Sequence, residues 1–106
     1  MSAIDDSVKN LIDTIKESGE YLEYRKQLEL LKQDPELKRQ VDDFRKKNYE
    51  MQMNEDMDFG MLTQFQNEFK AFRRNPVVDS FLAAELDFCR MMQRINFSIT
   101  EAIDFE

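Results

Sequence analysis

From Asn75-Pro76 to its C-terminus the chain contains no further Gly or Pro, and this uninterrupted segment predicts one long helix. At about 100° per residue, many of its apolar residues fall along one side. We expect this first apolar row to face the protein core. Its members are Val77, Phe81, Ala84, Phe88, Met91, Met92, Ile95, Ile99, Ala102 and Ile103.

A second apolar row runs beside the first and consists of Leu82, Leu86, Cys89 and Phe97. A helix that is apolar over so much of its circumference needs cover on two sides. Because a chain of 106 residues builds only a modest core, we expect the second cover to come from another subunit or from a partner protein. The residues left to face water are Asp87, Arg90, Arg94 and Glu101.

The composition favours a mostly helical protein, with two Gly and two Pro against 42% hydrophobic and 35% charged residues. We expect a single domain over residues 1–106. No segment approaches the roughly 18 apolar residues of a membrane span, so we expect no membrane insertion. The acidic N-terminus lacks the apolar core of a secretion signal, and a single cysteine suits a reducing cytoplasm. We therefore expect a cytoplasmic protein.

Capping signals divide the rest of the chain into helices. Ser2 precedes an amphipathic segment that begins at Ile4. Ser18-Gly19 either ends the helix of this segment or only kinks it. Asp34-Pro35-Glu36 is a strong helix start, and the segment from Asn54 to Gly60 has the composition of a loop or frayed turn. The apolar residues of the predicted helices are Ile4, Val8, Leu11, Ile12 and Ile15; Tyr21, Tyr24, Leu28 and Leu31; Leu37, Val41, Phe44 and Met51; Leu62, Phe65, Phe69 and Phe72.

These segments predict an all-α antiparallel bundle of long helices with one elongated core, completed by homodimerisation. Asn48 stands where the row of its helix calls for an apolar residue, as a register-fixing or a solvated side chain. Met51 and Met61 are expected to fill the end of the core. Met53 and Met57 fit no apolar row, so they are candidates for contact with a partner.

The residue types that most enzymes and metal sites require are scarce. There is no histidine, which removes His-based acid–base catalysis and His-containing zinc sites. Two glycines, Gly19 and Gly60, cannot form a phosphate-binding loop. Cys89 is interpreted as a small buried hydrophobe, with a metal or redox site shared between two subunits as the alternative. We expect a protein that is not an enzyme and holds no cofactor or metal.

A net charge of −7 argues against general nucleic-acid binding, which depends on cations that neutralise phosphates. Two basic clusters stand out against this charge, and we interpret both as solvated helix positions. The alternative is a small helical RNA-binding protein that uses them. They are Arg45, Lys46, Lys47, Arg73 and Arg74.

Motifs spread over almost the whole chain resemble the YlbF/YmcA family of small helical bacterial regulators, which includes proteins of the YheA type. In the first half they include Asp34-Pro35-Glu36-Leu37, and in the second half Asn75-Pro76-Val77-Val78 and the segment FCRMMQRINFSITEAIDF from Phe88 to Phe105. The order and spacing of these elements carry the resemblance. Its other residues are Ser18, Glu20, Tyr21, Tyr24, Leu31, Val41, Phe44, Phe81 and Glu85.

The resemblance implies a non-catalytic regulator or adaptor built from long helices that dimerises through them. It also implies a protein partner, either a family paralogue or an endoribonuclease of the RNase Y type, with effects on RNA processing, competence, sporulation or biofilm formation. Some family members carry a cysteine-rich tail linked to iron–sulfur clusters, whereas this chain has Cys89 alone. The candidate interface residues for a dimer or partner are Leu82, Leu86, Cys89, Phe97, Met53 and Met57.

Overall fold

The computed structural model describes residues 2–54, 56 and 58–103, and within them the regular elements are five α-helices and no strand. The all-α expectation is therefore confirmed. The helices are α1 (Ala3–Lys16), α2 (Gly19–Lys32), α3 (Pro35–Met53), α4 (Phe59–Phe72) and α5 (Pro76–Ala102).

Each helix begins at a side chain that accepts a hydrogen bond from a backbone N–H two or three residues further on, so a free donor of the first turn is satisfied. Pro follows the cap in α3 and α5, where its missing N–H costs nothing. The cap at Ser18 settles the open question at Ser18-Gly19, because α1 ends at Lys16 and a separate α2 begins at Gly19. The capping residues are Ser2, Ser18, Asp34, Asp58 and Asn75.

The connection between α3 and α4 is shorter than the sequence predicts. Asp58 caps α4 by accepting a 2.8 Å hydrogen bond from the backbone N–H of Met61. Phe59 and Gly60 therefore belong to the helix, and their assignment to the loop is wrong. Met61 is 45% exposed, so the expectation that it fills the end of the core is also wrong. Met57 lies outside the described residues.

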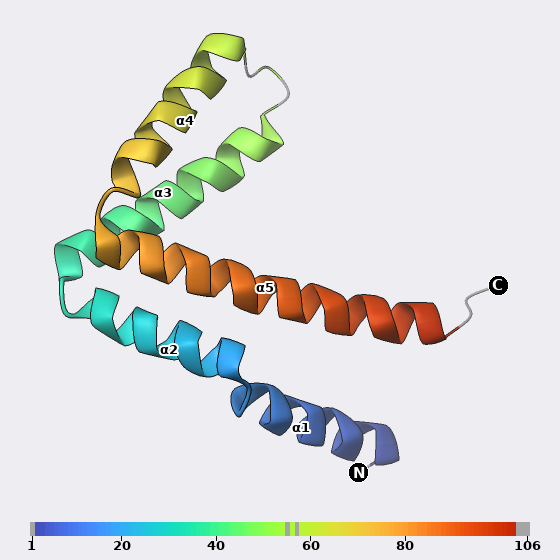
Figure 1. Cartoon of the computed structure of the whole chain (residues 1–106). Coiled ribbons are helices and arrows are strands. Elements are labelled where there is room, and N and C mark those ends of the chain that lie inside the picture. The colour runs from blue at the N-terminus through green and yellow to red at the C-terminus, as the bar shows by residue number, and fades with distance from the viewer. Residues whose placement is uncertain (1, 55, 57, 104–106) are drawn as a thin grey trace.

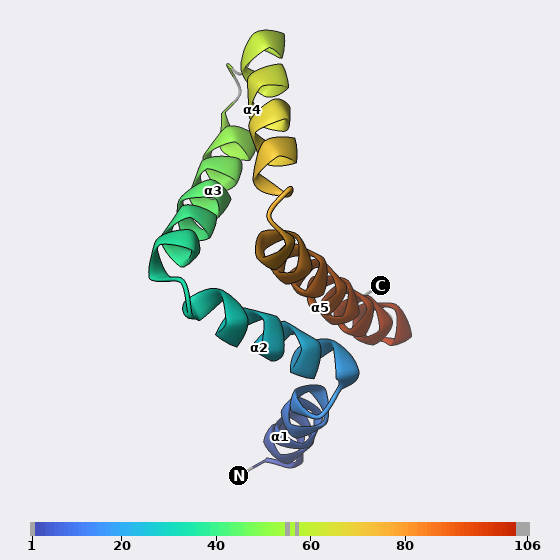
Figure 2. The ribbon, with the colours of Figure 1, turned by 60° about the vertical axis from the view of Figure 1, so that its left-hand side comes forward.

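The helices form two antiparallel pairs that diverge from a common junction (Figure 1). One pair is α2 with α5, and α1 continues from α2 along the same arm. The other pair is the α3–α4 hairpin, which projects away from that arm in both views (Figure 2). The molecule measures 50 × 39 × 20 Å, and its radius of gyration is 17.7 Å, against about 13 Å for a compact domain of this length. Within each pair the helices are antiparallel as predicted, but the two pairs make an open V.

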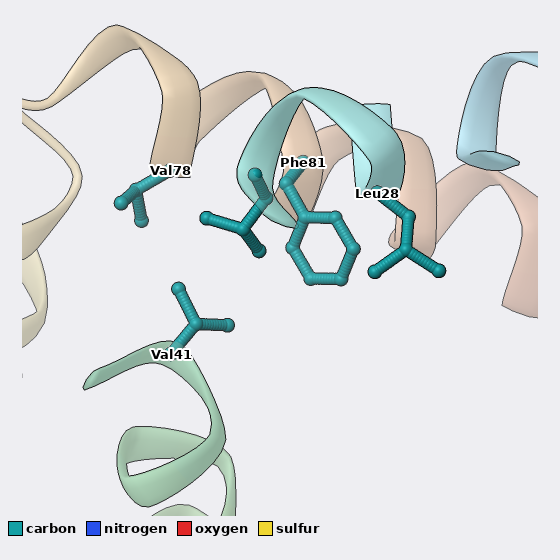
Figure 3. Packing of buried hydrophobic residues seen from close by; sticks show 5 residues of the cluster. Leu28, Val41, Val78 and Phe81 are labelled. Carbon is teal, nitrogen blue, oxygen red and sulfur yellow. The ribbon is translucent and has the colours of Figure 1, made fainter. Parts of the chain in front are cut away.

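The buried core lies at the junction of the two arms. Leu31 and Val41 meet Val78 and Phe81 there, and all four are at most 1% exposed, with Leu28 at the edge (Figure 3). Side chains from α2, α3 and α5 thus hold the V together. The expectation of one elongated core is wrong, because the two helix pairs separate beyond this junction.

The first apolar row of α5 needs two corrections. Val77 was expected in the core but is 38% exposed, whereas its neighbour Val78 is fully buried. At the other end of the helix, Ile99, Ala102 and Ile103 are exposed, because α5 extends past the helices that cover its first half. The middle of the row is buried or half-buried as expected.

Aromatic rings join the helices of each pair. In the α2–α5 pair, the ring of Tyr24 stacks on Phe88 with centroids 5.5 Å apart. In the hairpin, Phe44 of α3 stacks on Phe65 and Phe69 of α4 at 5.0 and 5.2 Å. Such contacts add about 0.5–1.5 kcal/mol each beyond area burial, and they fix the walls of the V.

Candidate interaction surface

The chain exposes far more surface than a compact protein of its mass. Its accessible area is 8285 Å², whereas a compact monomer of 12.7 kDa exposes about 6,200 Å². Large apolar side chains account for part of the excess. Ile4 is 74% exposed, Phe59 82%, Phe97 65% and Met53 64%. These four side chains lie on α1, α4, α5 and α3, so the exposed apolar surface is spread over several helices.

A groove lies in the angle of the V, between α3 and the first half of α5. We call it the α3–α5 groove; its volume is about 400 Å³. The α5 wall is formed by residues spaced three and four apart, which places them on one side of that helix. This wall consists of Leu82, Glu85, Leu86 and Cys89, and the α3 wall includes Phe44, Arg45, Asn48, Tyr49 and Gln52.

The walls of the groove are apolar at their base and polar at their edges. Phe44 is held at the base by its stacking on the α4 rings, so the groove begins where the hairpin meets α5. Tyr49 is 61% exposed one turn further along α3. Leu82 is half-buried and Leu86 is 48% exposed on the opposite wall. The groove thus presents aromatic and aliphatic surface that residues 2–54, 56 and 58–103 leave uncovered.

One ion pair spans the groove. A guanidinium nitrogen of Arg45 lies 2.9 Å from Oε2 of Glu85, whose side chain is 20% exposed. Oε2 is buried and has no hydrogen-bond partner among the described residues, so its contact with Arg45 is an ion pair. Buried polar atoms are normally hydrogen-bonded. The charge of the Arg45 guanidinium therefore compensates this buried carboxylate oxygen.

The structure brings three of the predicted interface residues together, since Leu82, Leu86 and Cys89 all line the groove. Cys89 is exposed, so the interpretation of this residue as a buried hydrophobe is wrong.

The other predicted interface residues lie apart from the groove. Phe97 is two turns further along α5, beside a hollow of about 410 Å³ lined with Arg90, Gln93 and Arg94. Met53 is the last residue of α3 and is largely exposed, but it does not line the groove. Met57 is outside the described residues.

The residues of the α3 wall were not predicted from the sequence to be site residues. Tyr49 and Gln52 lie off the apolar row of α3 and look like ordinary solvent positions. The available signal was Asn48, which interrupts that row and is half-buried in the groove. A polar residue in an apolar row marks the point where a helix leaves the core.

Three of the five basic candidates form ion pairs. Arg45 pairs with Glu85, the ammonium of Lys47 lies 2.7 Å from a carboxylate oxygen of Glu68, and Arg73 pairs with Asp79 at 2.7 Å. The hydrogen bond from Lys47 holds the pKa of Glu68 below its usual value. These cations have acidic neighbours and do not form an isolated basic patch.

Comparison with known proteins gives the family. The model of the family described as "Control of competence regulator ComK, YlbF/YmcA" matches residues 4–104. The chain belongs to this family. The resemblance inferred from the motifs is thereby confirmed, and the family is one of regulators.

Relatives in the YlbF/YmcA family are similar over nearly their whole length. A UPF0342 protein of Caldicellulosiruptor bescii is 24% identical over 110 residues, covering 100% of this chain and 92% of the relative. A UPF0342 protein of Desulfitobacterium hafniense is 29% identical over 105 residues, covering 95% and 85%. No solved structure matches the chain significantly. Among the described residues, no helix is long and apolar enough to cross a membrane.

Proposed function

We propose that this chain is a non-catalytic regulator that acts through protein–protein contacts, and that it forms a homodimer or higher homo-oligomer through the second apolar row of α5. The α3–α5 groove is the observation that carries the proposal. It gathers Leu82, Leu86 and Cys89 opposite Phe44 and Tyr49 of α3, and the described part of the chain leaves it open.

The size of the exposed surface supports self-association. The area exceeds that of a compact monomer by about 2,000 Å². Obligate homodimers bury about 2,000–5,000 Å² in total, or about 1,000–2,500 Å² from each partner. A second copy is therefore able to cover the excess through one reciprocal interface.

The regulatory role follows from the family, whose description concerns control of competence. We propose that the dimer contacts a family paralogue or an endoribonuclease of the RNase Y type. RNA processing, competence, sporulation or biofilm formation then depends on that contact. The RNA-binding alternative receives less support, because Arg45, Lys47 and Arg73 are engaged by Glu85, Glu68 and Asp79.

Complementation of a gene deletion with matched variants tests this function. Leu86→Glu places a charge in the groove, whereas Asp87→Ala changes the next residue, which is exposed and outside the groove. We expect Leu86→Glu to fail in restoring competence, sporulation or biofilm formation at normal protein level, and Asp87→Ala to succeed. Equal rescue by both variants contradicts a role for the groove.

A further inference from the structure

We propose that the tip of the α3–α4 hairpin binds a partner protein through a helix of that partner that is apolar on one face and cationic on its flanks. The hairpin tip comprises the last turn of α3 and the first turn of α4, with the exposed side chains Met53, Phe59 and Met61. This inference rests on the proposed role in protein–protein contacts. It assigns the contact with the partner to a surface outside the α3–α5 groove.

The apolar side chains of the hairpin tip are exposed. Phe59 is 82% exposed, more than any other large apolar side chain in the described part of the chain, and Met53 and Met61 are 64% and 45% exposed. Methionine is flexible and polarisable, so its side chain adapts to the shape of a partner. The hairpin tip thus offers one aromatic ring and two adaptable thioethers for contact with another protein.

The packing within the hairpin places these residues at the same end. Phe44 of α3 stacks on Phe65 and Phe69 of α4 at 5.0 and 5.2 Å. From these rings the two antiparallel helices run toward the tip at about 1.5 Å per residue, so Met53 and Phe59 both lie about 12–14 Å further on. They are therefore level with each other, at the end of the hairpin that projects away from the junction core (Figure 1).

The charge around the hairpin tip selects the kind of partner. Residues 48–69 contain five acidic residues and no basic one, whereas the rest of the chain contains 17 acidic and 15 basic residues. Most of the net charge of −7 is therefore concentrated on this part of the hairpin. Glu50 and Asp56 are exposed, and neither forms an ion pair with a described residue. Apolar side chains flanked by uncompensated carboxylates are complementary to a cationic amphipathic helix.

Other occupants fit this charge poorly. A second copy brings an equally acidic hairpin tip, which repels the first, and the rest of that copy is nearly neutral and offers no compensating charge. Nucleic-acid phosphates and anionic lipid surfaces are repelled for the same reason. The homodimer proposed above uses α5 and the α3–α5 groove, so it leaves the hairpin tip accessible.

Titration of the full-length chain with a synthetic peptide tests the proposal. The peptide has about 18 residues, with Leu at helical spacings of three and four and Lys at the other positions. Two control peptides carry Glu in place of Lys, or the same composition with the leucines scattered. We expect only the first peptide to bind. Methyl NMR signals of the methionines locate it, because those of Met53 and Met61 should shift while those of Met91 and Met92 on α5 stay in place.

Variants separate docking at the hairpin tip from general attraction of a cationic peptide to an acidic protein. Phe59→Ala removes the most exposed ring and should raise the dissociation constant about fivefold or more. Glu50→Gln combined with Asp56→Asn should raise it about threefold or more. The matched control, Asp87→Asn combined with Glu101→Gln, removes the same charge from α5. In 0.15 M salt, where the Debye length is about 8 Å, this control should change the constant by less than about 1.5-fold.

Three results overturn the proposal: equal weakening by the two charge variants, larger shifts at Met91 or Met92 than at Met53, or no binding of the cationic peptide. Light scattering on Phe59→Ala without peptide tests the second copy as the occupant. A molar mass below that of the unmodified chain assigns the hairpin tip to contact between copies and also overturns the proposal. A monomer in the unmodified chain overturns the homodimer alone, because the peptide titration does not depend on it.

Discussion

Truncation of Leu86 to alanine weakens dimerisation by an amount that follows from its exposure. Burying a whole leucine side chain is worth about 1.5–3 kcal/mol. Leu86 is 48% exposed in the single chain, so about half of this, or about 1 kcal/mol, is available to the interface. Because a two-fold dimer contains the residue twice, the loss is about 2 kcal/mol, which raises the dissociation constant about 30-fold.

Sedimentation equilibrium over a dilution series measures this constant, and thermal unfolding at low concentration measures the fold of the separate chain. About half of Leu86 is already buried in the single chain, so Leu86→Ala should also lower the stability of that chain, by about 1 kcal/mol. Asp87→Ala is the matched control and should alter neither quantity. The reasoning is refuted if Leu86→Ala leaves the dissociation constant unchanged, or if it unfolds the single chain by the 2–5 kcal/mol of a core leucine.

Three further predictions concern the fold. Val78→Ala should lower the free energy of unfolding by about 2 kcal/mol in a denaturant titration, whereas Val77→Ala, at a 38% exposed position, should change it by less than about 0.5 kcal/mol; equal losses contradict the burial described. Asp34→Ala removes the 3.1 Å cap on α3 and should cost about 1 kcal/mol, visible as a melting temperature lower by about 4–8 °C. Lys47→Ala should raise the pKa of Glu68 toward its usual value in an NMR titration. Because the native pKa is lowered, the stabilisation from this pair is present above the unfolded pKa and is lost as the pH falls through the folded one; an unchanged pKa contradicts the contact.

The helices were predictable because their boundaries are local. Asp34-Pro35 and Asn75-Pro76 carry both the capping acceptor and the proline of a first turn within adjacent residues. The start of α4 was harder to locate, since Asp58 caps it without a proline. There the composition of the neighbouring residues resembles a loop.

The arrangement of the helices was not predictable. Helical periodicity fixes the angles between side chains around one helix, but it does not say on which side a neighbouring helix packs. Val77 and Val78 lie about 40° and 60° to either side of Phe81 on α5, so periodicity hardly separates them. The α3 helix happens to stand on the side of Val78, which is therefore buried. That choice depends on the angle at the junction.

Only one wall of the candidate surface was predictable, because the position of α3 relative to α5 could not be inferred from periodicity. The α5 wall could be identified from the excess of apolar residues on one helix. The α3 wall could not, because Tyr49 and Asn48 acquire a role only when α3 and α5 diverge. Exposure of Cys89 follows from that divergence too, since a closed bundle would have covered it.

Light scattering coupled to size-exclusion chromatography, with the unmodified chain at micromolar concentration, tests the central claim most directly. The account predicts a molar mass of twice the 12.7 kDa of the chain, or a higher multiple. A single species at 12.7 kDa would contradict it, because the second apolar row of α5 and the α3–α5 groove would then remain uncovered in solution.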